Sequence, residues 1–196
     1  MKCPYCGSER VEQGIYVITG VMAAGKSTVA QALAKRLERC VHLHGDVFRK
    51  MIVTGREEMC EHPSPEALRQ LDMRYDIAAK VAKAYYDYGF TVVVQDNYLG
   101  DRLPYFLRLL DDYPMFVIVL NPDLATIEQR ELLRGKKGYG GFSAAGLHKM
   151  FLDETPYIGL WLDNSHWSVE ETVDEILRRA DQDAKVDRLA LGCTDT

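Results

Sequence analysis

Gly20-Val-Met-Ala-Ala-Gly25-Lys26-Ser27 fits the pattern G-x-x-x-x-G-K-[ST] and begins one residue after the apolar run Ile15-Tyr-Val-Ile18. Apolar residues recur at helical spacing after it, at Ala30, Leu33, Ala34 and Leu37. This order predicts a strand, a turn that gathers backbone N–H groups, and a helix whose positive end points at the same place. Motif, strand and helix coincide, so a chance strand-to-helix turn is disfavoured and polyphosphate binding is predicted.

The side chains of this turn have distinct expected roles. Lys26 is expected to reach the β- and γ-phosphates of a nucleotide, and the Ser27 hydroxyl to hold Mg²⁺. We predict nucleotide contacts along the whole turn and into the first turn of the helix, at Gly20, Val21, Met22, Ala23, Ala24, Gly25, Lys26, Ser27 and Thr28.

Composition limits the class of protein. The chain has 196 residues, of which 47% are hydrophobic and 27% charged, which is ordinary for a single soluble domain. Its net charge of −5 argues against nucleic acid as the main partner. No apolar run approaches the roughly 20 residues of a membrane span, and no apolar stretch follows Lys2 as in a signal peptide. We expect a cytoplasmic protein, monomeric or homodimeric, without a membrane partner.

The N-terminal extension, residues 1–13, contains the pair Cys3-Pro-Tyr-Cys6. The chain has five cysteines, an odd number, so no disulfide framework is expected. Three interpretations of the pair stay open: an extension without function, half of a Zn²⁺ site, or a redox pair. The spacing of the other residues identifies no further zinc ligand.

From residue 14 the chain alternates between strand-like and helix-like segments. This order predicts an α/β fold, a three-layer α/β/α sandwich around a five-stranded parallel sheet. We place the domain at residues 14–180 and a flexible tail at 181–196. Strands are expected at 15–19, 41–44, 91–95, 115–120 and 157–162, and helices at 26–38, 66–87, 102–111, 123–134, 144–153 and 169–180.

Acidic residues follow two of the expected strands, where ligands bind in parallel sheets. Asp46 comes after the second strand and is our candidate for the base that accepts a hydroxyl proton in phosphoryl transfer. The alternative is a simple helix cap, since Val47 to Met51 reads as a short helix. Asp96 ends the third strand and is expected to hold Mg²⁺ through water; the alternative is a loop-opening turn at Asp96-Asn97.

Two arginines lie four residues apart on the helix expected at 123–134. Arg130 and Arg134 share one face of that helix, and Gly135-Lys-Lys-Gly-Tyr-Gly-Gly141 follows. A glycine-rich basic segment of this kind indicates a lid that closes over the nucleotide, with the arginines contacting its phosphates. The alternative is a solvated helix face with ion pairs to nearby glutamates.

These features together resemble the chloramphenicol phosphotransferase-like kinases. The features are the phosphate-binding turn, the acid after the second strand, Asp96-Asn97-Tyr-Leu-Gly100, and Arg130-x-x-x-Arg134 before the glycine-rich segment. That family is part of the adenylate-kinase-like branch of phosphate-loop kinases, with zeta toxins and gluconate and shikimate kinases. The resemblance covers about residues 14–180. It implies a kinase that uses ATP and Mg²⁺ and phosphorylates a hydroxyl of a small molecule, antibiotic-type or sugar-like.

The resemblance also implies residue roles. Asp46 would take the hydroxyl proton, Lys26 and Ser27 would serve ATP and Mg²⁺, and Arg130 and Arg134 would clamp phosphates. The acceptor is expected near Asp46 and the 54–76 region, with contacts from Arg49, Arg74, Tyr75 and Asn97. Residues 51–74 match no single member of the branch. A UDP-sugar kinase, a nucleic-acid 5′-end kinase, and a nucleotide-dependent regulatory module without phosphoryl transfer stay open.

Overall fold

The five apolar runs form the parallel strands of one sheet, in the order β2-β3-β1-β4-β5. We describe them in a computed structural model that gives residues 12–134 and 143–187. All five predicted strands are present, within one residue of expectation except at the start of β5. Their bounds are β1 Ile15–Thr19, β2 Cys40–His44, β3 Thr91–Gln95, β4 Met115–Leu120 and β5 Leu160–Leu162.

β5 begins three residues later than predicted because of Gly159. This glycine has φ +73°, and a Cβ at its position would lie 2.4 Å from the carbonyl oxygen of Val117. The backbone here therefore turns sharply against β4, in a conformation that a side chain would disfavour, before the strand begins.

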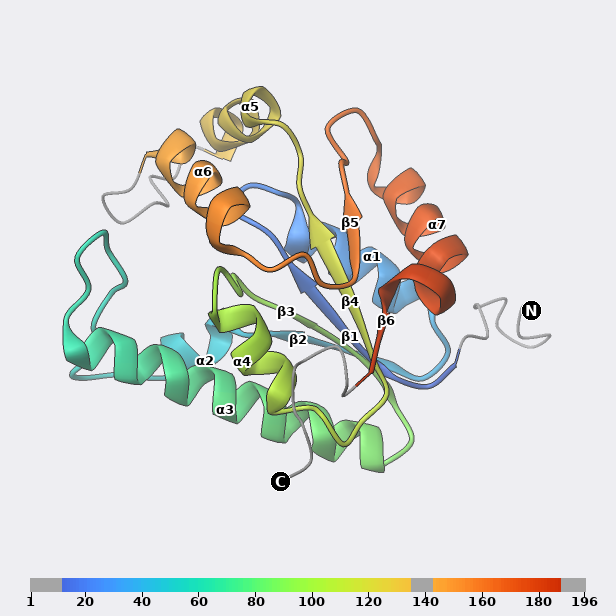
Figure 1. Cartoon of the computed structure of the whole chain (residues 1–196). Coiled ribbons are helices and arrows are strands. Elements are labelled where there is room, and N and C mark those ends of the chain that lie inside the picture. Colours follow the sequence, from blue (N-terminus) through green and yellow to red (C-terminus); the bar gives the residue numbers. More distant parts are fainter. Residues whose placement is uncertain (1–11, 135–142, 188–196) are drawn as a thin grey trace.

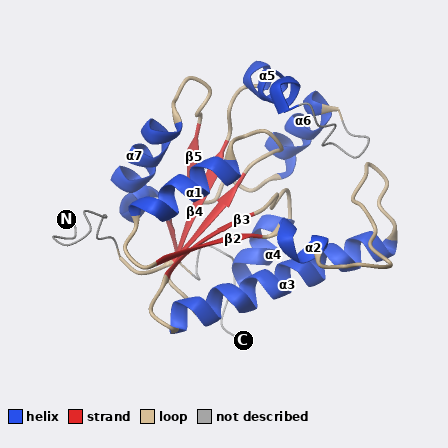
Figure 2. Ribbon diagram, turned by 180° about the vertical axis from the view of Figure 1, so that it is seen from behind, coloured by secondary structure: helices blue, strands red, loops and turns tan. Residues whose placement is uncertain are grey.

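Helices cover both faces of the sheet, as the alternating pattern predicted. In Figure 2 α1 crosses one face with α7 beside it, and α3 and α4 lie on the other side. α3 begins as expected, because the Ser64 hydroxyl accepts a hydrogen bond from the Ala67 N–H and Pro65 occupies the first turn. The helices are α1 Lys26–Arg36, α2 Asp46–Lys50, α3 Pro65–Asp87, α4 Arg102–Arg108, α5 Leu124–Arg134, α6 Ala144–Glu154 and α7 Val169–Arg179.

The first part of the expected tail is folded. Residues Ala180–Ala184 form a π-helical turn, and Lys185–Val186 form β6, which pairs antiparallel with β4. Ala180, Ala184 and Val186 are buried against the sheet. The prediction of a flexible tail from residue 181 is therefore wrong for residues 181–187, and its remainder lies outside the described residues.

The core is a single apolar cluster on both sides of the central strands. Every residue of β1, β3 and β4 is buried, and Tyr16 stacks on Phe116 across two of them with ring centroids 4.6 Å apart. Continuous burial of this kind is typical of parallel strands covered by helices on both faces. No helix in residues 12–134 and 143–187 combines the length and the apolar character that a membrane crossing requires.

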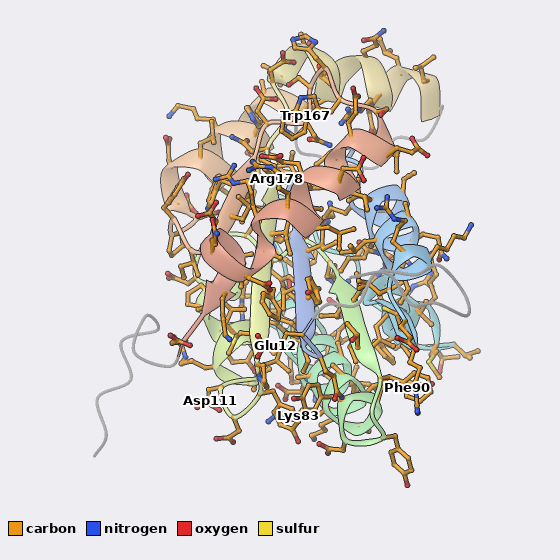
Figure 3. The ribbon with its side chains drawn as sticks, turned by 90° about the vertical axis from the view of Figure 1, so that its right-hand side faces the viewer. Glu12, Lys83, Phe90, Asp111, Trp167 and Arg178 are labelled. Atoms are coloured by element: carbon orange, nitrogen blue, oxygen red, sulfur yellow. The ribbon has the colours of Figure 1, made fainter. Side chains whose placement is uncertain are left out.

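The parallel register brings the carboxyl ends of the strands to one edge of the sheet. Ile15 lies opposite both Val92 and Met115, so β1, β3 and β4 run level. Figure 3 shows Glu12, Phe90 and Asp111, which precede these strands, at one end of the molecule, and Trp167, which follows β5, at the other. In Figure 1 the arrows of β4 and β5 point toward the end of the molecule where α5 lies. This edge is the position where parallel sheets bind ligands.

Candidate active site

The turn between β1 and α1 has the backbone of a phosphate-binding loop. Gly20 and Gly25 have φ +143° and +98°, and Ala23, which is not a glycine, has φ +63°. A Cβ on Gly20 would lie 2.3 Å from the carbonyl oxygen of Leu120, so the loop approaches β4 too closely for any side chain at this position. Gly25 is the N-cap of α1, which aims the positive helix end at the loop.

Lys26 and two residues from distant elements hold this loop. The Lys26 ammonium is buried and donates to the carbonyl oxygens of Gly20 and Val21, at 2.9 and 2.7 Å. Arg130 Nη1 on α5 and Asn164 Nδ2 after β5 each donate to the Ala24 carbonyl oxygen at 3.2 Å. Both sides of the loop are therefore fixed, as a preorganised phosphate site requires.

Arg130, a predicted phosphate contact, lies against the phosphate loop. Its Nη2 also donates to the Asn164 carbonyl oxygen at 3.0 Å, which joins α5 to the loop after β5. Burial lowers the pKa of Arg130, an effect that the Asp123 carboxylate opposes. A half-buried guanidinium at this position can contact phosphate oxygens with two N–H groups. Arg134 ends α5, but its side chain and the glycine-rich segment 135–142 lie outside the described residues.

The end of β2 lies against the start of α1. Ser27 is exposed, and its Oγ is 3.2 Å from Nε2 of His44, the last residue of β2. Burial lowers the pKa of His44, while Asp46 and Asp96 raise it and Lys50 and Lys26 lower it. His44 is therefore surrounded by the charged groups of the strand-end loops. The Ser27 hydroxyl, which is expected to bind metal, thus contacts the strand that leads to Asp46.

Asp46 is the first residue of α2 and is partly exposed, with 28% of its side-chain area accessible. The N-cap of this short helix is Gly45, so the cap alternative for Asp46 is wrong. Its Oδ1 accepts from Arg49 Nε at 2.7 Å, and its Oδ2 lies 2.8 Å from Lys50 Nζ. Burial raises the pKa of Asp46, but hydrogen bonds and charge from these two cations outweigh it and lower the pKa to about 2. The carboxylate is ionised at neutral pH.

The salt bridges of Asp46 continue into the segment that follows α2. Arg49 also pairs with Glu58, and Glu58 pairs with Arg56 at 3.1 Å. Glu58 is well exposed, with 59% of its side-chain area accessible. Arg49, an expected acceptor contact, therefore lies beside Asp46 and links it to residues 51–64.

A buried cluster lies directly beneath Asp46. Arg74 and Asp96 are only 8% and 7% exposed. Arg74 Nη2 donates to Asp96 Oδ1 at 3.2 Å, and Arg74 Nε lies 3.0 Å from Oδ2. The neighbouring Tyr75 hydroxyl donates to the Asn97 carbonyl oxygen at 2.8 Å. The expected acceptor contacts Arg74 and Tyr75 thus have their partners inside the protein, an arrangement that does not support that role.

Asp96 closes this cluster against the turn between β2 and α2. Its Oδ1 also accepts from the Asn97 N–H at 2.7 Å, while Oδ2 is buried and accepts no hydrogen bond from the described residues. Burial raises the pKa of Asp96, an effect that Arg74 and the Asn97 N–H oppose. A Cβ on Gly45 would lie 2.2 Å from Asp96 Oδ2. Only glycine lets this turn lie so close to the carboxylate.

The residues at this edge fit a magnesium ion held mainly by phosphates and water. Within the described ranges, no three His, Cys, Asp or Glu side chains come together as a protein-only metal site. Mg²⁺ in phosphate sites takes few protein ligands and keeps several waters. The exposed Ser27 hydroxyl and the buried Asp96 Oδ2, which accepts no hydrogen bond from the described residues, are oxygen ligands of the kind that Mg²⁺ prefers. Cys3 and Cys6, the zinc candidates, lie outside the described residues, and that interpretation stays a prediction.

An open groove of about 580 Å³ runs from the phosphate loop along α1 to α7. It begins at Ser27 and Thr28, and its far wall includes the apolar side chains of Val169 and Val173. The groove follows α1 from its first turn to Lys35 and Arg36 in its last turn.

Three residues of this site were not predicted as functional residues. They are His44, Gly45 and Asn164. A glycine between a strand and a helix indicates close backbone approach, and that signal was available. The contacts of His44 and Asn164 depend on packing between distant segments and leave no local pattern.

Comparison with known proteins agrees with this geometry. Residues 14–181 match the family model of chloramphenicol phosphotransferase-like proteins. No curated protein matches the chain significantly. Among solved structures, an APS kinase of Mycobacterium tuberculosis in complex with AMPPNP and APS is similar with a TM-score of 0.65 and 16% identity, over 87% of this chain and 98% of that one.

Two further structures share the fold. A sugar kinase from Janibacter sp. HTCC2649 has a TM-score of 0.61 and 16% identity, and covers 86% of this chain and 95% of its own. A tunicamycin resistance protein from Deinococcus radiodurans has a TM-score of 0.61 and 16% identity, with coverage of 89% and 99%. At this level of identity the likeness establishes the three-layer phosphate-loop kinase fold and nothing about substrates.

Proposed function

The chain belongs to the chloramphenicol phosphotransferase-like family, and from that premise we propose that it is an ATP-dependent kinase that phosphorylates a hydroxyl of a small molecule. One observation carries the proposal. Asp46, a partly exposed and ionised carboxylate, follows the strand whose last side chain contacts Ser27 of the phosphate loop. Phosphoryl transfer needs such a group beside the phosphates to orient and deprotonate the attacking hydroxyl.

In the proposed step the acceptor oxygen forms a bond to the γ-phosphorus of ATP. The bond from that phosphorus to the β–γ bridging oxygen breaks, and ADP leaves with its electron pair. Asp46 accepts a hydrogen bond from the acceptor hydroxyl and receives its proton as the new bond forms. The low pKa of Asp46 is compatible with this role, because in a loose transition state the proton moves late. Arg49 and Lys50 leave lone pairs of the carboxylate for the acceptor, since a carboxylate has about four.

The charged groups around the loop would neutralise the phosphates. Lys26 would turn from the Gly20 and Val21 carbonyls to the β- and γ-phosphates, and Arg130 would contribute N–H groups from the opposite side, with Arg134 beside it. Ser27 would bind Mg²⁺ directly and Asp96 through water, and the metal would offset charge on the phosphate oxygens. The groove beside Thr28 is our candidate for the nucleoside end of ATP.

The acceptor would bind on the other side of Asp46, between α2 and residues 54–76. Arg49 and Asn97 are the polar candidates that remain partly exposed there. The family is named after a chloramphenicol phosphotransferase, and the neighbouring structures include a sugar kinase and an APS kinase. We therefore assign the class of acceptor as a hydroxyl-bearing small molecule and leave its identity to the experiment.

The test is an ADP-release screen over hydroxylated antibiotics, sugars and nucleosides with wild-type protein, ATP and Mg²⁺. Each positive compound is examined by mass spectrometry for one added phosphate. Asp46→Asn should bind ATP normally and lose turnover with that compound. Asp101→Asn, an exposed carboxylate at the start of α4 that makes no cap hydrogen bond, is the matched control. Undiminished turnover in Asp46→Asn would refute the base.

The same screen separates the alternatives. UDP-sugars and 5′-hydroxyl oligonucleotides belong in it, and a product from either would identify that narrower class of kinase. A regulatory module predicts ATP binding and slow hydrolysis with no compound that stimulates ADP release. That outcome would refute the proposed transferase.

A further inference from the structure

We infer that Arg74 and Asp96 form a buried positioning pair that holds the turn carrying Asp46, and that Arg74 acts through Asp96 without touching the acceptor. The inference rests on the proposed role of Asp46 as the base. It gives Arg74, which the sequence placed in the acceptor pocket, a different task.

Burial and pairing establish that the two side chains act as a unit. Arg74 lies on α3 and Asp96 at the end of β3, 22 residues apart, and each is more than 90% buried. Two of the three guanidinium nitrogens face the carboxylate, at 3.2 and 3.0 Å. A buried charge without its partner is strongly destabilising. Neither side chain can turn toward a ligand without leaving the other charge uncompensated.

Asp96 contacts the backbone of Gly45, the residue before Asp46. The position of a Cβ on Gly45 would be 2.2 Å from Asp96 Oδ2 and 2.9 Å from Cγ, so the carboxylate packs against the Gly45 backbone. The Gly45 N–H donates to the Gln95 carbonyl oxygen at 3.0 Å, which ties the same turn to the residue before Asp96. Asp46 is the next residue. The orientation of the carboxylate therefore sets where α2 begins.

α3 also contacts the loop after β3 through the residue next to Arg74. The Tyr75 hydroxyl donates to the Asn97 carbonyl oxygen, and the Asn97 N–H donates back to Asp96 Oδ1. Arg74 and Tyr75, adjacent in sequence, thus fix Asp96 and Asn97, also adjacent. One helix thereby controls the loop after β3 and, through Asp96, the loop after β2.

The experiment compares Arg74→Met, Arg74→Lys and the neutral pair Arg74→Met/Asp96→Asn with the wild type. Arg69→Met is the control, since Arg69 is an exposed arginine of the same helix that pairs only with Glu66 among the described residues. Local order is measured by amide hydrogen exchange of the peptide that covers residues 45–50, and global order by exchange of β4 and by the melting temperature. ATP with Mg²⁺ is the binding probe.

The positioning role predicts a local effect. In the neutral pair, which leaves no unpaired buried charge, exchange at residues 45–50 should rise by about tenfold or more while β4 is unchanged. Arg74→Lys should restore part of the protection, because it keeps the charge but not the two-nitrogen contact. In Arg74→Lys, which keeps the Asp96 carboxylate, affinity for ATP with Mg²⁺ should change less than about threefold, since no phosphate or metal contact is removed. With an acceptor from the screen, Arg74→Lys should lower kcat and leave the acceptor KM unchanged.

Two results would overturn the inference. The first is exchange at residues 45–50 in the neutral pair that matches the Arg69→Met control. The second is an acceptor KM that rises while kcat is kept, which is the signature of direct acceptor binding. A failed ADP-release screen would instead refute the kinase proposal, and it would leave the exchange result intact.

Discussion

Replacement of Gly45 by alanine tests the close contact on which the position of Asp46 depends. Gly45 has φ −56° and ψ −33°, ordinary right-handed helical values. Alanine adopts these values without strain. On backbone grounds the change should therefore stabilise the protein by about 0.4–1 kcal/mol, because it restricts the unfolded chain.

The side chains around Gly45 make the expected effect of Gly45→Ala on stability unfavourable. The new Cβ would meet three atoms of Asp96, with Oδ2 at 2.2 Å, Cγ at 2.9 Å and Cβ at 3.1 Å. Asp96 is held by Arg74 and the Asn97 N–H, so it cannot move without weakening a buried pair. Overpacking costs about 1–3 kcal/mol, and complete loss of a buried partner about 3–5 kcal/mol. After the backbone gain we expect a net loss of about 2 kcal/mol, or roughly 4–8 °C in melting temperature for a chain of this size.

Urea unfolding of four proteins, the wild type and three variants, measures this cost in a mutant cycle. Gly45→Ala is made in the wild type and in an Arg74→Met/Asp96→Ala background, which lacks Oδ2 and Cγ but keeps the Cβ at 3.1 Å. In that background the cost should fall by at least about 1 kcal/mol. Gly45→Ala that is as stable as the wild type, or that costs the same in both backgrounds, would refute the reasoning.

Three further predictions concern the charged groups of the site. Lys26→Met should weaken ATP binding by about 10- to 100-fold in calorimetry, because one charge-assisted contact is lost. Lys80→Met, at an exposed lysine of α3, is the control and should leave ATP binding unchanged. The pKa of Asp46 is lowered to about 2 in the folded protein, so its ion pairs stabilise the fold above about pH 4 and are lost as the pH falls from about 4 to 2. The free energy of unfolding of the wild type should therefore drop across that range by about 1–2 kcal/mol more than that of Asp46→Asn. Removal of Mg²⁺ with EDTA should abolish acceptor-dependent ADP release, with recovery on adding Mg²⁺ back, and release that persists would contradict the metal role of Ser27.

Local patterns predicted the donor half of the site. The phosphate loop, its strand and its helix are contiguous in sequence, and glycine spacing alone specifies the backbone that Gly20 and Gly25 adopt. The strand-end rule also located Asp46 and Asp96 correctly at one edge of the sheet, because parallel register follows from the alternation of strands and helices.

The parts of the site that were not predicted depend on tertiary contacts, which leave little pattern in the local sequence. Arg74 lies on the helix whose stripe includes Leu71 and Tyr75, yet a charged side chain is normally expected at the surface. Its burial depends on Asp96, which comes from another element. β6 was missed for a different reason, since two residues are too few for periodicity to indicate a strand.

Two layers of contacts around Asp46 differ in what they cost to change. Beneath it, Arg74 and Asp96 are buried, and loss of either partner is expensive. Beside it, Arg49 and Glu58 are paired near the surface, where ion pairs contribute only about 0–1 kcal/mol. The Arg49–Glu58 contact between α2 and residues 51–64 can therefore change at little cost while the turn that carries Asp46 stays in place. The two apolar side chains Met51 and Val53, 68% and 92% exposed, are in that segment, which makes it the first place to introduce variants that change acceptor choice without loss of the fold.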